Sequence, residues 1–199
     1  MRLGALFAYH PRPDLLSTEA IAEPLAYNLA RAVARYDDVA STLVHGLKYS
    51  DRLDLSPMMG RLMAHACCEL LADAGAPVPV PLHWRRRWAR RYNQSAVLAR
   101  TISAICGVPV THGGLKLSAP HRSRSDGLEP SAPITSKGHF LSQPEHRVEV
   151  AGRHLVLVDD VLTSGATVYA CTHTLLRAGA AQVDVLVFAR VVALARSPI

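Results

Sequence analysis

Two adjacent carboxylates beside a small, hydroxyl-rich turn are the residues of this 199-residue sequence best suited to chemistry. Asp159 and Asp160 directly follow a short apolar run, Leu155 to Val158, whose composition is typical of a buried strand. Paired acids placed there can accept hydrogen bonds from sugar hydroxyls or attract a cation. A helix N-cap or a surface acid pair is the alternative interpretation, and the residues that follow argue against it.

The turn after the acids supplies donors for an anion. Its residues are Thr163, Ser164, Gly165, Ala166 and Thr167. Backbone N–H groups at a helix start, together with three hydroxyls, would hold a phosphate. The turn contains neither the G-x-x-x-x-G-K pattern of a P-loop nor the G-x-G-x-x-G pattern of a dinucleotide site. Acceptors for hydroxyls beside donors for a phosphate predict a phosphorylated sugar as the ligand.

A parallel sheet would place these groups together. The strand at 155–158, a helix over 166–178 and an apolar strand over 183–192 form a βαβ unit. Ligands of such sheets lie beyond the carboxyl ends of the strands. We therefore predict an α/β fold with three layers, a parallel β-sheet between flanking helices. The other elements predicted are a helix over 53–74, a strand over 76–82, a helix over 93–106 and a strand over 108–111.

Two further segments complete the expected organisation. A helix over 18–36 is interpreted as a small helical N-terminal extension, which divides the chain into residues 1–35 and a main domain of residues 36–199. Residues 113–146 are rich in Gly, Ser, Pro and His and are expected to form a long loop. The helix over 53–74 is expected to bury the face formed by Leu55, Met58, Met59, Leu62, Met63, Ala66, Leu70 and Leu71.

The bulk composition is that of a globular protein, with 49% hydrophobic and 19% charged residues. No apolar run is long enough for a membrane span and no signal peptide is recognisable, so a cytoplasmic protein without a membrane partner is expected. The four cysteines form no C-x-x-C pair, which favours buried reduced thiols and no protein-held metal. A net charge of +6 fits a polyanionic ligand, either nucleic acid or a phosphorylated small molecule.

The stretch Val156 to Thr167, VLVDDVLTSGAT, resembles the signature of the phosphoribosyltransferases that use phosphoribosyl pyrophosphate (PRPP). The resemblance implies that Asp159 and Asp160 hold the ribose hydroxyls. It also implies that the turn from Thr163 to Thr167 holds the 5′-phosphate. Mg²⁺ would be the cofactor, bound mainly through PRPP.

A second stretch narrows the resemblance. Val78 to Ala99, VPVPLHWRRRWARRYNQSAVLA, is similar to the ComF branch of the type I phosphoribosyltransferase proteins, which is associated with competence and DNA uptake. Lys48 matches a lysine that usually follows the first apolar segment of that family. The four-cysteine zinc ribbon with which the family often begins is not found in this sequence. The implied pyrophosphate loop consists of Val80, Pro81, Leu82 and His83, with Arg85 beside it.

The resemblance implies transfer of phosphoribose to an unidentified nitrogen acceptor, with release of pyrophosphate. The alternative is a non-catalytic protein that binds PRPP or a nucleotide and assists DNA-uptake proteins. This alternative is favoured by Ser125, Pro133 and Ser136, which stand where the family usually has glutamine, arginine and asparagine. A homodimer is a reasonable expectation for the fold.

A cluster of arginines and aromatic residues leaves three interpretations open. Its members are Trp84, Arg85, Arg86, Arg87, Trp88, Arg90, Arg91 and Tyr92. The cluster could neutralise a pyrophosphate, or contact single-stranded DNA through phosphate contacts and base stacking. It could equally be a solvated basic face over buried aromatic rings.

Overall fold

The computed structural model describes residues 26–49, 52–73, 76–82, 92–111, 115–118, 139–141 and 147–192. The elements in chain order are β1 (Ala30–Arg35), α2 (Asp38–Tyr49), the 3₁₀ helix η1 (Leu53–Leu55), α3 (Ser56–Asp73), β2 (Ala76–Pro79), α5 (Gln94–Cys106), β3 (Lys116–Ser118), β4 (His139–Leu141), α6 (Arg147–Val150), β5 (His154–Leu162), α7 (Ala166–Arg177) and β6 (Gln182–Arg190).

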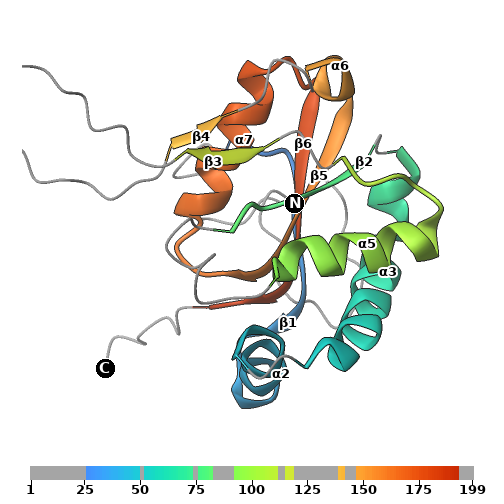
Figure 1. The fold of residues 1–199 in the computed structure, drawn as a ribbon, viewed down its shortest axis with the longest axis vertical. Helices are drawn as coiled ribbons and strands as arrows, with labels where there is room; N and C mark the ends of the chain where they lie inside the picture. Colours follow the sequence, from blue (N-terminus) through green and yellow to red (C-terminus); the bar gives the residue numbers. More distant parts are fainter. Residues whose placement is uncertain are drawn as a thin grey trace, which may run out of the picture.

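A four-stranded parallel sheet with the strand order β1-β6-β5-β2 forms the centre of the described chain. Helix α7 lies on one side of the sheet, and α3 and α5 lie on the other (Figure 1). Each side has its own hydrophobic core. One contains Leu155, Leu157 and Leu175 of α7, and the other contains Val156, Val158 and Phe188 together with residues of α2, α3 and α5. The predicted three-layer α/β fold is therefore confirmed.

The central strands are buried on both faces because both layers of helices cover them. All seven residues from Val183 to Ala189 of β6 are buried, as are Leu155 to Val158 of β5. Strands buried on both sides have continuous apolar sequences, and that pattern made these two strands predictable. The predicted strand over 76–82 forms as the shorter β2.

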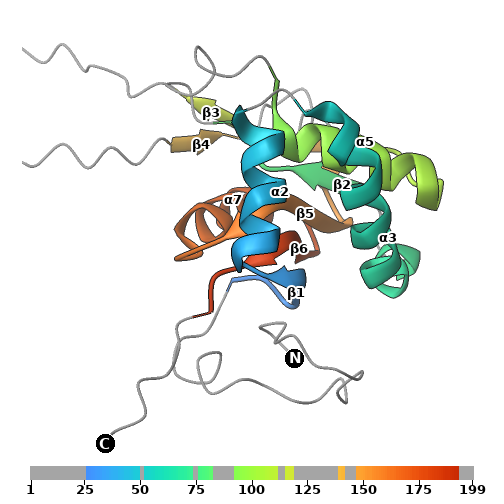
Figure 2. The ribbon, with the colours of Figure 1, turned by 90° about the horizontal axis from the view of Figure 1, so that it is seen from below.

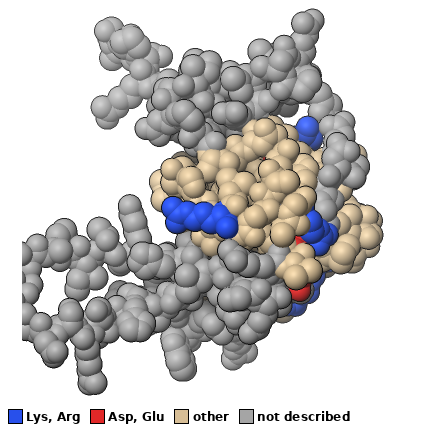
Figure 3. Space-filling model, turned by 90° about the horizontal axis from the view of Figure 1, so that it is seen from above, with Lys and Arg blue, Asp and Glu red and all other residues tan. Residues whose placement is uncertain are grey.

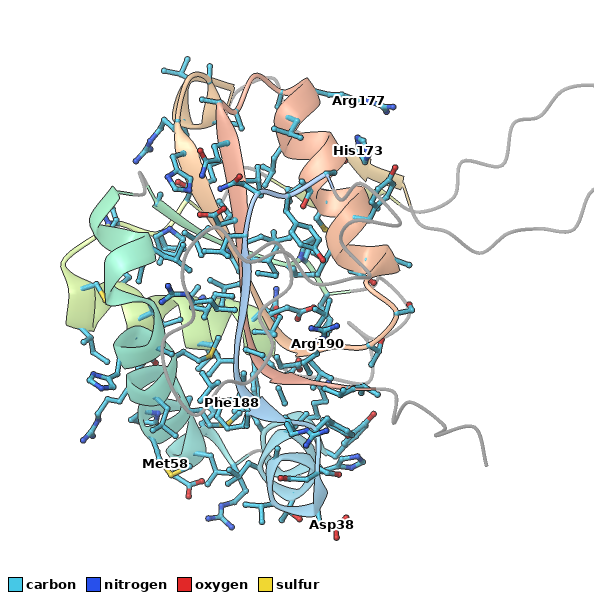
Figure 4. All side chains as sticks on the ribbon, turned by 180° about the vertical axis from the view of Figure 1, so that it is seen from behind. Asp38, Met58, His173, Arg177, Phe188 and Arg190 are labelled. Atoms are coloured by element: carbon cyan, nitrogen blue, oxygen red, sulfur yellow. The ribbon has the colours of Figure 1, made fainter. Side chains whose placement is uncertain are left out.

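The three predicted helices that follow residue 52 are confirmed with small changes of boundary. Residues 53–73 form η1 and α3, residues 94–106 form α5, and residues 166–177 form α7. Half of the predicted face is buried, namely Met59, Met63, Leu70 and Leu71, and Leu55 and Ala66 are half-buried. Met58 and Leu62 were expected on that face but are 41% and 45% exposed, and Figure 4 shows Met58 on the outer side of α3.

The expected helix over 18–36 is wrong for its last part. Residues 30–35 form β1, which pairs in parallel with β6 from Ala30↔Val185 to Arg35↔Arg190. Alanine and arginine favour helices, but the hydrogen bonds offered by the exposed edge of β6 override that weak preference. The described part of the expected extension thus belongs to the sheet, and residues 18–25 lie outside the described residues.

The expected strand over 108–111 does not form. Only Thr111 donates a backbone hydrogen bond to β2, 3.0 Å from its nitrogen to the oxygen of Pro77. The backbone N–H of Val80 donates a hydrogen bond to Val158 of β5. The backbone nitrogens of Pro77 and Pro79 therefore lie on the other edge of β2, away from β5. Proline has no N–H group, which prevents a regular ladder on that edge.

The segment expected as a long loop contains two short strands. β3 and β4 form a separate antiparallel sheet, and β4 packs near α7 (Figure 1). Residues 119–138, including Ser125, Pro133 and Ser136, lie outside the described residues. The residues before β5 form the short helix α6.

A close crossing of α3 and α5 gives a testable stability prediction. A methyl group at Gly60 would lie 2.6 Å from Cβ of Thr101, much closer than the two atoms can approach. We expect Gly60→Ala to lower the free energy of unfolding by about 1–3 kcal/mol, measured by urea unfolding. Gly46→Ala in α2 is the control, because its methyl group would meet only the flexible end of Leu55. Equal stabilities of the two variants would contradict the prediction.

Two other observations bear on sequence expectations. Cys171 is buried, as expected, whereas Cys106 is half-buried, and the side chains of Cys67 and Cys68 lie outside those described. Among the described helices, none combines the length and the apolar character needed to cross a membrane.

Candidate phosphate and sugar site

The carboxyl ends of the four parallel strands meet at one edge of the sheet. Figure 2 looks toward this edge, with α2 in front. The chain leaves β2 at Val80, β5 at Leu162 and β6 at Val191 on this edge. Strand β1 also ends at this edge, where Tyr36 donates a backbone hydrogen bond to the oxygen of Arg190 at the end of β6. Helix α2 begins two residues later.

The acid pair lies inside β5, not after it as expected. β5 continues to Leu162, since its pairing with β6 extends to Leu162↔Arg190. Its pairing with β2 ends at Pro79↔Val158, so the acids begin where one neighbouring strand stops. Asp160 is buried, with 6% exposure, while Asp159 is half-buried. The side chains of successive strand residues alternate between faces, so the two carboxylates approach the edge from opposite sides of β5.

Asp159 is fixed by two donors to one of its oxygens. Oδ1 of Asp159 accepts hydrogen bonds from Oγ of Ser95 at 2.8 Å and from the backbone nitrogen of Asp160 at 2.9 Å. Ser95 lies in the first turn of α5, which begins at the N-cap residue Asn93. The start of α5 therefore helps to orient the acid pair.

Asp160 is fixed by a cation. Oδ1 of Asp160 lies 2.8 Å from Nζ of Lys48, and the two side chains are only 9% and 17% exposed. Lys48 belongs to the last turn of α2. Among the described residues, the second oxygen of neither carboxylate makes a hydrogen bond or an ion pair, so each acid retains one acceptor for a ligand.

Burial first, and the charge of Asp160 second, raise the pKa of Asp159 from its usual 3.8 to about 7. The hydrogen bond from Ser95 and the charge of Lys48 act in the opposite direction. Burial also raises the pKa of the Cys171 thiol on α7, with a further contribution from Asp159. Cys171 is thus an inert core thiol beneath the acid pair.

The small-residue turn joins the acids to the start of α7. Thr163, Ser164 and Thr167 are exposed, and Gly165 is the N-cap residue with φ of 75°. Only glycine adopts this left-handed conformation without strain. No side chain of the described residues caps α7, so its first N–H groups are available to an anion.

The end of β2, where the predicted pyrophosphate loop begins, lies next to the acids. Val80 donates a backbone hydrogen bond to Val158 at 2.9 Å, and its oxygen accepts one from Nδ2 of Asn93 at 3.0 Å. Pro81 and Leu82 follow directly and are half-buried. His83 and Arg85 lie outside the described residues.

The arginine and aromatic cluster is described only at Tyr92, whose hydroxyl donates a 2.7 Å hydrogen bond to the oxygen of Leu47. Residues 83–91 lie outside the described chain, so its three interpretations stay open. On the face shown in Figure 3, the described Lys and Arg side chains are separated by uncharged residues and do not form one patch.

Two groups of the site were not found by reasoning from residue patterns. Ser95 was counted only as part of a helix, although an Asn-x-Ser helix start beside the predicted sheet edge was a usable signal. Arg190 ends β6 opposite Leu162, next to the small-residue turn, and it can be seen in Figure 4. Its position depends on strand register, which the sequence alone does not specify.

A parallel α/β sheet with an acid pair and a small-residue helix start at its carboxyl edge agrees with the phosphoribosyltransferase-like class that the sequence resembles. No family model matches the chain. The DNA utilization protein YhgH of Escherichia coli (strain K12) is 34% identical over 168 residues, covering 77% of this chain and 68% of its own. Competence protein F of Haemophilus influenzae is 26% identical over 163 residues, covering 79% and 71%. The chain belongs to the ComF family, which includes these proteins.

Two more distant similarities accompany them. An adenine phosphoribosyltransferase of Mycobacterium sp. (strain KMS) is 39% identical over 77 residues, 39% of this chain and 40% of its own. A crystal structure of TT1426 from Thermus thermophilus is 16% identical, covers 72% of this chain and 86% of its own, and has a TM-score of 0.42. At that level the structural likeness adds nothing to the fold described above.

Proposed function

We propose that this protein binds PRPP and transfers its phosphoribosyl group to a nitrogen nucleophile, releasing pyrophosphate. Asp159 and Asp160 would accept hydrogen bonds from the ribose hydroxyls. The turn from Thr163 to Thr167 would hold the 5′-phosphate, and the segment after β2 would lie beside the pyrophosphate.

The observation that carries this proposal is that each acid of the pair uses one of its two oxygens within the protein. One oxygen of Asp159 is engaged by Ser95 and the backbone, and one oxygen of Asp160 is engaged by Lys48. The remaining two oxygens lie at the same edge of the sheet, one on each side of β5, and would accept hydrogen bonds from the 2′ and 3′ hydroxyls of a ribose placed across that edge. The start of α7 follows after five residues, at a position where a 5′-phosphate would complete the ligand.

In the reaction, the bond from the anomeric carbon to pyrophosphate breaks and a bond to nitrogen forms. Positive charge develops on the sugar ring, and the adjacent carboxylates favour it electrostatically. Positioning of the two reactants supplies most of the remaining rate enhancement. Among the described residues, no three His, Cys, Asp or Glu side chains come together as a metal site. As the family resemblance implies, Mg²⁺ would be held mainly by PRPP and would neutralise the departing pyrophosphate.

A second candidate is a protein that binds PRPP or a nucleotide without turnover and assists DNA uptake. The names of two relatives, a DNA utilization protein and Competence protein F, favour this role. Contact with single-stranded DNA would fit the same role, and the arginine cluster at 84–92 is its candidate surface.

Calorimetry with PRPP and Mg²⁺ tests the proposal. We expect saturable binding by the wild type and none by Asp159→Asn/Asp160→Asn, with Asp37→Asn/Asp38→Asn as a control of equal charge change. Pyrophosphate release in the presence of a panel of bases and amines then distinguishes the two candidates. Binding without release supports the accessory role, and no binding by the wild type overturns both.

A second ligand series checks the sugar contact. Ribose 5-phosphate should bind at least about tenfold more tightly than 2-deoxyribose 5-phosphate, because the missing hydroxyl leaves one carboxylate oxygen without its donor. Equal affinities would contradict a role of the acid pair in holding the diol.

A further inference from the structure

Lys48 places a positive charge inside the site, against the acid pair. Its Nζ lies 2.8 Å from Oδ1 of Asp160, and neither side chain is more than 17% exposed. A pair this far from solvent persists only when its geometry is fixed, because each ion has lost most of its hydration.

The helix that carries Lys48 is anchored in the turn that precedes the lysine. Val44 and Leu47 of α2 are completely buried in the core that α2 shares with α3 and α5. The oxygen of Leu47 also accepts a 2.7 Å hydrogen bond from the hydroxyl of Tyr92, two residues before α5. The ammonium group is therefore positioned by the fold.

We propose that Lys48 is the permanent counter-ion of the acid pair and lets the site bind a pentose 5-phosphate without a divalent cation. This inference rests on the proposed function. With Lys48 present, the two carboxylates and the ammonium group together carry no more than one net negative charge. The sugar hydroxyls can therefore approach the acids without a metal ion to neutralise them. Any requirement for Mg²⁺ would come from the pyrophosphate of PRPP alone.

The electrostatics of the pair support this role. Among the described residues, no hydrogen bond joins Asp159 to Lys48, yet the charge of Lys48 lowers the pKa of Asp159. Lys48 therefore pairs directly with Asp160 and also favours the ionised form of Asp159, which burial opposes.

The test uses ribose 5-phosphate and calorimetry on the full chain, in EDTA and in Mg²⁺. Wild-type affinity should agree within about twofold in the two conditions. Lys48→Met should bind about tenfold or more weakly in EDTA and regain affinity in Mg²⁺, while Lys48→Arg should keep binding in EDTA. Arg52→Met is the matched control, since Arg52 is an exposed cation paired with Asp54.

A pH series separates this role from a structural one. Without the lysine Asp159 should ionise at higher pH, so the affinity of Lys48→Met should rise at a higher pH than that of the wild type. A requirement of the wild type for Mg²⁺ would overturn the inference without using any variant, and so would unchanged binding by Lys48→Met in EDTA. If either of these results is found but the wild type still binds PRPP with Mg²⁺, only the inference about Lys48 fails and the proposed function stands. If the wild type also fails to bind PRPP, the proposed function fails as well.

Discussion

Asp160→Asn is expected to lower the free energy of unfolding by about 3 kcal/mol and to weaken binding of PRPP about 10- to 100-fold. The substitution leaves the ammonium group of Lys48 buried beside a neutral amide, 2.8 Å from its lost charge partner. An ion that has given up its hydration and then loses its counter-ion destabilises the fold by more than the pair itself contributed. Urea unfolding at about pH 7.5 measures the stability change.

Two controls isolate the cause of that loss. Asp54→Asn removes an acid from an ion pair of the same length, 2.8 Å to Arg52, whose side chains are 57% and 59% exposed. Stability should hardly change, because water replaces the lost partner. In Lys48→Met/Asp160→Asn both charges are absent. The double variant should therefore lose less free energy of unfolding than the two single variants lose together. Additive effects would show that the two side chains do not interact.

The sequence was sufficient to predict the part of the site that a single strand–turn–helix unit contains. β5 and α7 are adjacent in the chain, and their apolar runs, small turn residues and helix start are all local signals. The order of strand, turn and helix and the parallel neighbour β6 were therefore predicted correctly. The length of β5 was not, because it depends on how far β6 continues beside it, to Leu162↔Arg190.

The sequence was less informative about groups that reach the site from distant elements. Only a resemblance pointed to Lys48, because no helix was predicted over residues 38–49, although the buried residues Ala40, Val44 and Leu47 follow helical spacing. β1 was misassigned because its alanine-rich sequence has no strand preference of its own. Contacts such as Lys48–Asp160 and Ser95–Asp159 join elements that only the folded topology brings together.

The other acid of the pair should respond to the same substitution in the opposite direction. Asp159→Asn is expected to raise the free energy of unfolding at about pH 8 by about 1–3 kcal/mol while abolishing tight binding of PRPP. An asparagine oxygen can still accept the hydrogen bonds from Ser95 and from the backbone nitrogen of residue 160. The substitution removes only the charge that burial and Asp160 oppose.

The sign of the pH dependence follows from the raised pKa of Asp159. Between pH 3.8 and about 7 the folded protein retains a proton that the unfolded chain has released. This carboxyl therefore makes the wild type less stable as the pH rises through that window, and above it the destabilisation is complete. Since Asp159 keeps some contact with solvent, the effect should be smaller than the full shift in pKa would give.

Unfolding midpoints in urea at about pH 4, 6 and 8 test the prediction. The stability advantage of Asp159→Asn should be smallest at the lowest pH and grow toward the highest, where Asp160→Asn should instead be less stable than the wild type. An advantage that is constant with pH would mean that Asp159 titrates normally in the folded protein. A stable variant without binding would show that the charge at Asp159 is retained for the ligand at the expense of the fold.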